Sequence, residues 1–358
     1  MTKQIPVLVT GGAGFVGRHL VKTLLERGTK RIWIIDDLST GRLPREWLSD
    51  SWKRDTEETL DIYRKNEQEI TFVKEDALSF FYAQAKGTHP LKLPDFGDVF
   101  HLASIVGGRA LIEGDPILIA TDLGIDAVFF LWLTRRPKKV GRVLYASSSA
   151  SYPVKLQGKD GALALQEKHL DFNSGYVGVP DLTYGWSKLT GEFLSKLAHE
   201  KYGMHIACVR PFSGYGEDQD LAYPTPSIAL RVARGDDPIE VWGTGKQGRD
   251  FVHIDDCVDA FFAILDKVND GSGINIGTGV ATSFISLIEQ MLKVEGRKAL
   301  IKPLVDKPIG VETRYADTAA LFKRVGWKPK ISLQEGLKRV LAGAHERLNG
   351  NDLPFKIS

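Results

Sequence analysis

Cysteine is scarce in this chain of 358 residues, which holds only Cys208 and Cys257. Both fall inside apolar runs with no metal-ligand spacing around them, so the sequence offers neither a disulfide framework nor a cysteine-bound metal, and we expect two small buried side chains. No apolar run approaches the length that spans a bilayer, and the first ten residues lack a signal-peptide pattern. Since few cysteines also suit a reducing compartment, we expect a cytoplasmic protein without a membrane partner.

The chain also has no large excess of positive or negative charge. Lysine and arginine number 47 against 45 acidic residues, a net charge of +2 that is not gathered into a basic stripe. Nothing in this balance calls for a nucleic-acid partner. Apolar residues make up 43% and charged residues 26%, which is ordinary for a globular protein. The length suffices for a large core in two closely joined lobes.

A glycine-rich turn, residues 11–17, lies between an apolar run at 6–10 and a helical pattern at 18–25. Its glycines allow a tight turn, the approach of a pyrophosphate and close packing of the helix, whose N-terminus binds phosphates. A second apolar run, 31–35, ends on Asp36 and Asp37, and Asp36 comes 19 residues after Gly17. A carboxylate at that distance accepts hydrogen bonds from the adenosine ribose and repels a 2′-phosphate. The pattern predicts bound NAD rather than NADP.

Apolar runs continue to alternate with helical patterns, at 69–76, 98–103 and 142–146. This alternation predicts an α/β fold with a doubly wound parallel Rossmann-type sheet over residues 1–210. The polar stretch 42–68 is expected to be a surface helix on an elongated connection. After residue 210 the elements shorten, so 211–358 are expected to form a smaller α/β substrate lobe, with some chain crossing back to the first domain.

Tyr184 and Lys188 stand four residues apart in a helical pattern, so their side chains share a face. A nearby cation favours the phenolate, which makes tyrosine usable as a general base for removing a hydroxyl proton. Ser147, Ser148 and Ser149 follow the predicted strand 142–146, at the sheet edge where ligands gather in such folds. One of these hydroxyls could therefore hold the reacting oxygen beside Tyr184.

With these motifs in this order, the chain resembles the extended short-chain dehydrogenase/reductase family. The resemblance is to its nucleotide-sugar branch, with UDP-galactose 4-epimerase-like and GDP-mannose 3,5-epimerase-like enzymes. It covers nearly the whole chain and rests on the glycine turn and on residues 36–41, 100–104, 147–149, 184–188, 243–256 and 314–317.

The resemblance implies the following roles. Tyr184 would act as base while a sugar carbon loses hydride to NAD, Lys188 would bond the nicotinamide ribose and depress the pKa of Tyr184, and Ser148 or Ser149 would hold the same oxygen. The cofactor-binding set would be Gly11, Gly14, Phe15, Val16, Gly17, Asp36, Asp37, Asp76, Ala77, Leu102, Ala103, Ser104, Lys188 and Pro211.

A nucleotide-diphosphate-sugar substrate is implied by the same resemblance. Arg249 would bind its phosphates, with Lys307 or Arg314 as a second cation. Trp242 would lie against the nucleotide base, although simple core packing would also explain it. Ser213 stands where most relatives carry a substrate-binding asparagine, so the exact substrate does not carry over. The relatives also suggest a homodimer formed by helices near 112–135 and 185–201.

The identity of Ala150 limits which reaction of this family the chain could catalyse. The 4,6-dehydratases and decarboxylases of the branch carry carboxylates at or beside this position, and the 3,5-epimerases carry a cysteine after the serine pair. An NAD-dependent epimerase acting at C4 is therefore favoured. A nucleotide-sugar reductase or dehydrogenase and an epimerase acting at C2 or at C3/C5 stay open, as does a non-catalytic sensor on the same scaffold, since fold does not fix function.

Overall fold

The computed structural model describes residues 5–57, 60–136, 138, 140–158 and 162–358. Its centre is a nine-stranded sheet in the order β13-β8-β7-β6-β1-β2-β5-β4-β3. The strands are β1 (Val7–Thr10), β2 (Arg31–Asp36), β3 (Lys53–Glu57), β4 (Leu60–Lys65), β5 (Gln68–Lys74), β6 (Asp98–His101), β7 (Arg142–Ala146), β8 (Ile206–Pro211) and β13 (Asp270–Ile276). Neighbours from β13 to β5 pair in parallel, which confirms the predicted Rossmann-type sheet.

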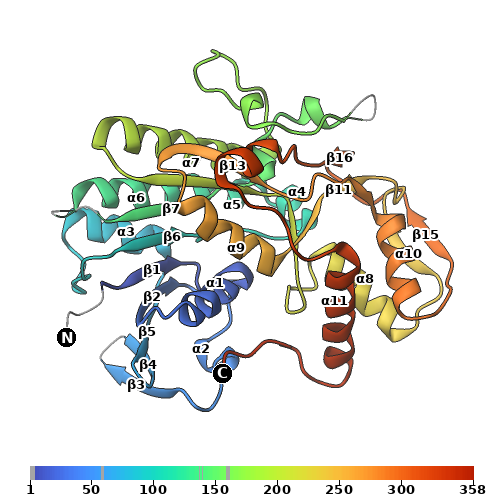
Figure 1. Cartoon of the computed structure of the whole chain (residues 1–358), viewed down its shortest axis with the longest axis horizontal. Helices are drawn as coiled ribbons and strands as arrows, with labels where there is room; N and C mark the ends of the chain where they lie inside the picture. The colour runs from blue at the N-terminus through green and yellow to red at the C-terminus, as the bar shows by residue number, and fades with distance from the viewer. Residues whose placement is uncertain (1–4, 58–59, 137, 139, 159–161) are drawn as a thin grey trace.

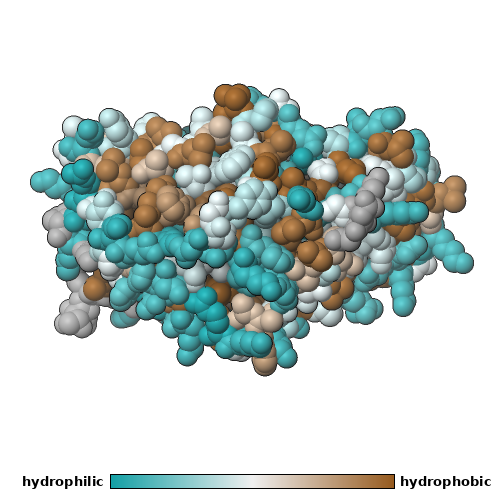
Figure 2. Space-filling view, turned by 90° about the horizontal axis from the view of Figure 1, so that it is seen from above, coloured by the Kyte–Doolittle hydropathy of each residue, from teal (hydrophilic) through white to brown (hydrophobic). Residues whose placement is uncertain are grey.

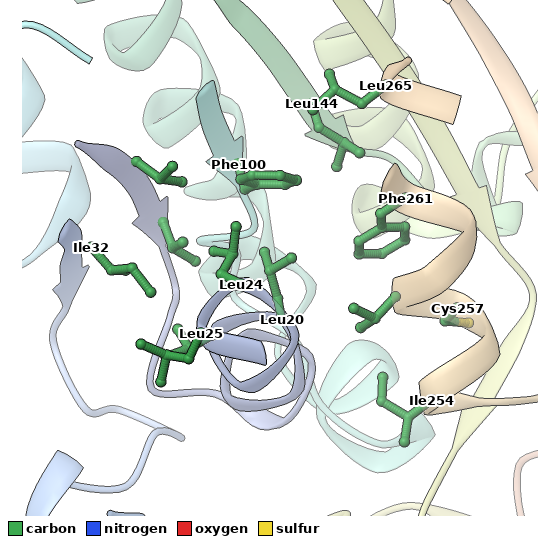
Figure 3. Packing of buried hydrophobic residues seen from close by; sticks show 14 of the residues in the cluster. Leu20, Leu24, Leu25, Ile32, Phe100, Leu144, Ile254, Cys257, Phe261 and Leu265 are labelled. Carbon is green, nitrogen blue, oxygen red and sulfur yellow. The ribbon is translucent and has the colours of Figure 1, made fainter. Parts of the chain in front are cut away.

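Helices cover both faces of this sheet (Figure 1). On one face, α1 (Phe15–Glu26) and α9 (Ile254–Leu265) lie side by side, and Leu20 of α1 and Phe261 of α9 point into one apolar cluster with Phe100 and Leu144 of the sheet (Figure 3). The other face carries α3 (Ala77–Lys86), α6 (Asp122–Arg135) and α7 (Leu182–Tyr202), which enclose a second cluster. Since both faces are covered, the central strands are buried along nearly their whole length.

The stretch 42–68 differs from the prediction of a surface helix. It holds one short helix, α2 (Pro44–Trp47), and then β3 and β4, which extend the sheet as an antiparallel hairpin beside β5. Residues 58–59, between the two strands, lie outside the described residues. All five residues of β3 are exposed, so the strand has no buried face and leaves no alternating apolar pattern.

The second lobe packs around a cluster of its own, formed mainly by α8 (Pro224–Arg234), α10 (Phe284–Val294) and α11 (Leu333–Leu348) with β10 (Ile239–Trp242) and β15 (Ile301–Leu304). The short strands β9 (Ser213–Tyr215), β11 (Gly248–Arg249), β12 (Phe251–His253), β14 (Thr282–Ser283) and β16 (Thr313–Arg314) link it to the sheet. The chain crosses back to the first domain with α9 and β13, which follow one another, and again with its last residues, where Phe355 and Ile357 join the first cluster. The predicted boundary at residue 210 stays a prediction.

The expectation that no apolar run is long enough to span a bilayer was wrong. The joined helices Pro116–Arg135 are long and apolar enough to cross a membrane by length and composition. They consist of α5 (Pro116–Ala120) and α6, and they include the buried Asp122 and Asp126. Asp122 accepts a hydrogen bond from Ser104, which follows β6, and Asp126 accepts one from Tyr145 of β7. The two aspartates therefore lie on the side of the segment that faces the protein, and 44% of its most apolar window is buried.

Candidate active site

The glycines of the turn 11–17 pack closely against neighbouring backbone, and the turn leaves the first amides of α1 without a hydrogen-bond partner from a capping side chain. Gly11 has φ +68°, and a Cβ there would lie 2.8 Å from the backbone nitrogen of Ala103. A Cβ on Gly17 would lie 2.2 Å from the carbonyl oxygen of Gly11, so the helix packs directly on the turn. Gly14 is the N-cap of α1 and provides no side-chain hydrogen bond. The first amides of α1, from Phe15 and Val16, are therefore left to a ligand.

Asp36 closes β2 beside this turn. Its carboxylate accepts hydrogen bonds from the backbone N–H groups of Ala13 and Leu38, both at 2.9 Å. A carboxylate offers about four acceptor sites, so two remain for hydroxyl groups. Burial raises the pKa of Asp36 above its ordinary value. Asp37 is exposed, and its carboxylate accepts a hydrogen bond from the amide of Ser39 at 2.8 Å.

Asp76 and Ala77, which were predicted to bind the cofactor, lie at the start of α3. Asp76 is the N-cap of this helix and accepts a hydrogen bond from the amide of Ser79 at 2.8 Å. Ala77 is buried behind it. Asp76 therefore has a structural task in the helix as well as the proposed place near the cofactor.

The segment after β6 is anchored to both β1 and α6. The hydroxyl of Thr10 accepts hydrogen bonds from the amides of Leu102 and Ala103. Ser104 donates to Asp122 at 2.5 Å. The same carboxylate lies 3.7 Å from the ammonium of Lys188. One buried aspartate thus ties the segment after β6 to helix α7 through Ser104 and Lys188.

Tyr184 and Lys188 lie on one face of α7, with the ammonium 5.8 Å from the centre of the phenol ring. Burial raises the pKa of Tyr184, while Lys188 lowers it. The expectation that Lys188 depresses this pKa is therefore right for its direction, but burial is the larger effect. Burial also lowers the pKa of Lys188, and Asp122 and Asp126 outweigh it and keep that pKa raised. The lysine is held as a cation beside the phenol.

The serines after β7 have different environments. Ser147 is buried and bonds to Ser151 and Glu192. Ser149 is buried in a short 3-10 turn. Ser148 is half-buried, its oxygen accepts the amide hydrogen of Ala150 at 3.1 Å, and its hydroxyl favours the ionised form of Tyr184. Of the two candidates left open by the sequence, Ser148 is the one that faces the tyrosine.

Three guanidinium groups gather around one carboxylate at the start of α7. Asp181, the residue before this helix, accepts two hydrogen bonds from Arg109 at 2.9 and 3.0 Å and one from Arg314 at 2.8 Å. Arg249 lies near both arginines, and burial together with their charges lowers its pKa to about 9. Such a cluster matches the charge of a diphosphate. Arg109 and Asp181 were missed because no motif surrounds either residue.

Of the other predicted substrate residues, Trp242 and Lys307 lie close together and Ser213 lies elsewhere. Trp242 is 41% exposed, so it does not pack in a core, and its ring lies 5.9 Å from the ammonium of Lys307. Arg314, rather than Lys307, is therefore the second cation near Arg249. Ser213 opens β9, which pairs with β12 outside the nine-stranded sheet. Pro211, which was predicted to bind the cofactor, ends β8 opposite Ile276 of β13.

The residues at the turn fit NAD. The uncapped amides of α1 suit a pyrophosphate, and the free acceptor sites of Asp36 suit a ribose diol. A Cβ on Gly14 would meet one backbone oxygen at 3.3 Å, so its outer side is open to a ligand. Lys188 has a buried ammonium near Asp122, and this group can donate a hydrogen bond to a second ribose hydroxyl.

Comparisons with known proteins agree with this geometry. The model of the NAD dependent epimerase/dehydratase family matches residues 7–277. The UDP-glucuronate 4-epimerase of Thermodesulfobacterium geofontis is 29% identical, with 95% of this chain and 96% of that protein covered. The GDP-mannose 3,5-epimerase of Arabidopsis thaliana is 25% identical, with 94% and 81% covered.

Among solved structures, UDP-glucose 4-epimerase from Thermotoga maritima, crystallised with UDP-glucose, superposes with a TM-score of 0.75. It is 23% identical, and the match covers 96% of this chain and 100% of that one. At this identity the likeness shows the fold. The family match spans more than two thirds of the chain, and the resemblance found in the sequence is confirmed. This chain belongs to the NAD dependent epimerase/dehydratase family and uses NAD.

Proposed function

We propose that this protein is a nucleotide-diphosphate-sugar epimerase that acts at C4. The observation that carries the proposal is the pairing of Tyr184 and Ser148 beside a buried Ala150, with no acid side chain in the adjacent position. Dehydration or decarboxylation needs an added acid or base there. Inversion at C4 needs only one proton acceptor and one hydrogen-bond donor on the reacting oxygen.

The nearby carboxylates among the described residues are already engaged. Asp181 is bonded to two arginines, Asp122 to Ser104 and Lys188, and Glu192 to Arg210. Their partners hold them in ion pairs, so they are poor candidates for a second proton acceptor. This supports a single base at the site.

The roles of the residues follow from their positions. NAD, held by the glycine turn, Asp36 and Lys188, would supply reversible hydride transfer at C4 and a positive charge near Tyr184. Tyr184 takes the proton of the C4 hydroxyl and later gives it back, and Ser148 donates a hydrogen bond to the same oxygen. Lys188 favours the ionised phenol by its positive charge, against the larger opposing effect of burial on the pKa of Tyr184. Arg249 and Arg314 hold the diphosphate while the sugar presents each face in turn.

A panel of UDP-, GDP-, dTDP- and CDP-sugars tests this function. The purified protein should retain NAD, need no added cofactor and invert C4 in at least one sugar, as read by NMR. Tyr184→Phe should abolish the product, whereas Tyr202→Phe, at the far end of α7, should leave it unchanged. A strict requirement for added NADPH with net reduction would instead identify a reductase, and inversion at C2 or C3/C5 would correct the position.

The homodimer is part of the proposal. Apolar side chains lie exposed on the face that carries α5–α6 and α7, which Figure 2 shows from above. They include Ile117, Leu118, Leu123, Trp186 and Phe193. A patch of this kind marks an interface. Phe193→Asp should shift the mass measured by light scattering from dimer to monomer, and a wild type that is already monomeric would remove the proposal.

Localisation and the remaining partners rest on the sequence. We propose a cytoplasmic protein because it holds two cysteines, both buried and unpaired. The near-neutral charge supports small-molecule substrates over nucleic acid. Expression with a fluorescent tag and cell fractionation would test the location.

A further inference from the structure

The last ten residues leave the second lobe and return to the dinucleotide side. After α11 the chain runs back to α2, and its C-terminus lies beside that helix (Figure 1). The amide of Ile357 donates to the carbonyl of Trp47 at 2.7 Å, and the amide of Ser49 donates to the carbonyl of Ile357 at 2.9 Å. Residues 349–358, here named the C-terminal strap, therefore end in a parallel bridge with the α2 segment.

The strap is held by buried side chains as well as by its backbone. Phe355 is 9% exposed and Ile357 is 5% exposed, and both belong to the cluster under α1. The ring of Phe355 packs against that of His19 on α1 with 4.6 Å between centroids. The strap thus contacts the same helix whose first amides face the cofactor.

A short series of hydrogen bonds leads from the strap to the ribose-binding carboxylate. The indole of Trp47 donates to the carbonyl of Arg42 at 2.8 Å. The amide of Arg42 donates to the carbonyl of Ala13 at 3.0 Å, and the amide of Ala13 donates to Asp36 at 2.9 Å. Each step fixes the backbone of the next, so anchoring Trp47 also orders the loop 36–42.

The strap also forms part of a cavity wall. A cavity of about 170 Å³ lies between the start of α1, the loop 36–42, the segment 218–221 and the end of α11. Phe15, Thr40 and Arg42 line it on the dinucleotide side, and Asp352 and Leu353 line it from the strap. Residues more than 300 positions apart in sequence thus share one opening at the edge of the cofactor site.

We infer that the C-terminal strap is a positioning element of the dinucleotide site and sets how tightly NAD is retained. A loop that is ordered before the ligand arrives has less freedom to lose on binding, so affinity rises. Phe355 and Ile357 act through Trp47 and Arg42 and do not touch the reacting atoms. The inference rests on NAD binding alone and holds whichever sugar carbon is inverted.

The test compares Ile357→Asp and Phe355→Ala with Ser358→Ala, an exposed position in the same strap. NAD that copurifies with each protein is measured, and the Kd of the stripped protein for NAD is determined by calorimetry. We expect the Kd to rise about tenfold or more in the first two variants and to stay unchanged in the control. Hydrogen exchange without cofactor should be faster in residues 36–42 of the same two variants.

Activity separates positioning from folding. At saturating NAD, both variants should recover the wild-type kcat and the wild-type KM for the sugar, because the substrate residues are untouched. A Kd for NAD within twofold of the wild type overturns the inference. A loss that saturating NAD does not restore also overturns it, because the strap would then serve only the fold. If Ile357→Asp does not fold, Ile357→Ala is measured in the same way.

Discussion

Replacing Glu192 by alanine should destabilise the protein by about 3–5 kcal/mol, the range for removing one partner of a buried ion pair. Its carboxylate accepts hydrogen bonds from Arg210 at 2.9 and 2.5 Å and bonds to Ser147. The two charged side chains are only 1% and 3% exposed, so water screens the pair weakly. Without Glu192, the guanidinium keeps the hydroxyl of Tyr152 at 3.0 Å and loses its counter-charge.

The assay is urea unfolding followed by tryptophan fluorescence, extrapolated to zero denaturant. Glu240→Ala is the matched control, since Glu240 pairs with Lys302 at 3.0 Å with both side chains about half exposed. It should cost less than about 1 kcal/mol. A double replacement of Glu192 by leucine and Arg210 by methionine should cost less than Glu192→Ala alone. If Glu192→Ala and Glu240→Ala cost the same within error, the reasoning from burial is wrong.

Three further outcomes are expected. Gly17→Ala, whose Cβ would meet backbone at 2.2 Å, should lower the free energy of unfolding by about 1–3 kcal/mol, whereas Gly114→Ala, which meets nothing within 4 Å, should not lower it. Lys188→Met should move the acidic limb of the kcat/KM profile to higher pH, because the charge that lowers the pKa of Tyr184 is gone; an unmoved limb would refute this. A hydrogen bond with His19 lowers the pKa of Asp255 to about 2, so the contribution of this carboxylate to stability is present above its ordinary pKa of 3.8 and disappears as the pH falls. Acid unfolding should show that the stability advantage of wild type over Asp255→Asn shrinks between pH about 4 and about 2.

The sequence predicted the parts of the fold that depend on local patterns. Buried parallel strands appear as continuous apolar runs, and the glycine turn with Asp36 needs no distant partner to be recognised. The β3–β4 hairpin was missed because its outer strand is exposed along its length and is rich in charge. A strand without a buried face has no alternation of apolar and polar residues from which it could be predicted.

The site divides in the same way. Tyr184 and Lys188 share one helix, so their spacing alone brings them together. The choice of Ser148 over Ser149 depends on which hydroxyl turns outward, and the recruitment of Arg109 depends on a contact 72 residues away with Asp181. Tertiary contacts of this kind cannot be predicted from the sequence around either partner.

The position of β13 has a consequence for how the protein is made. β8 is paired on its outer edge only by β13, which is synthesised some sixty residues later. Until residue 276 leaves the ribosome, the growing sheet presents the unpaired backbone of β8, including the buried Cys208, to solvent. Open edges of this kind invite pairing with other chains. We expect a chain stopped at residue 210 to aggregate, and one extended past 276 to escape this hazard.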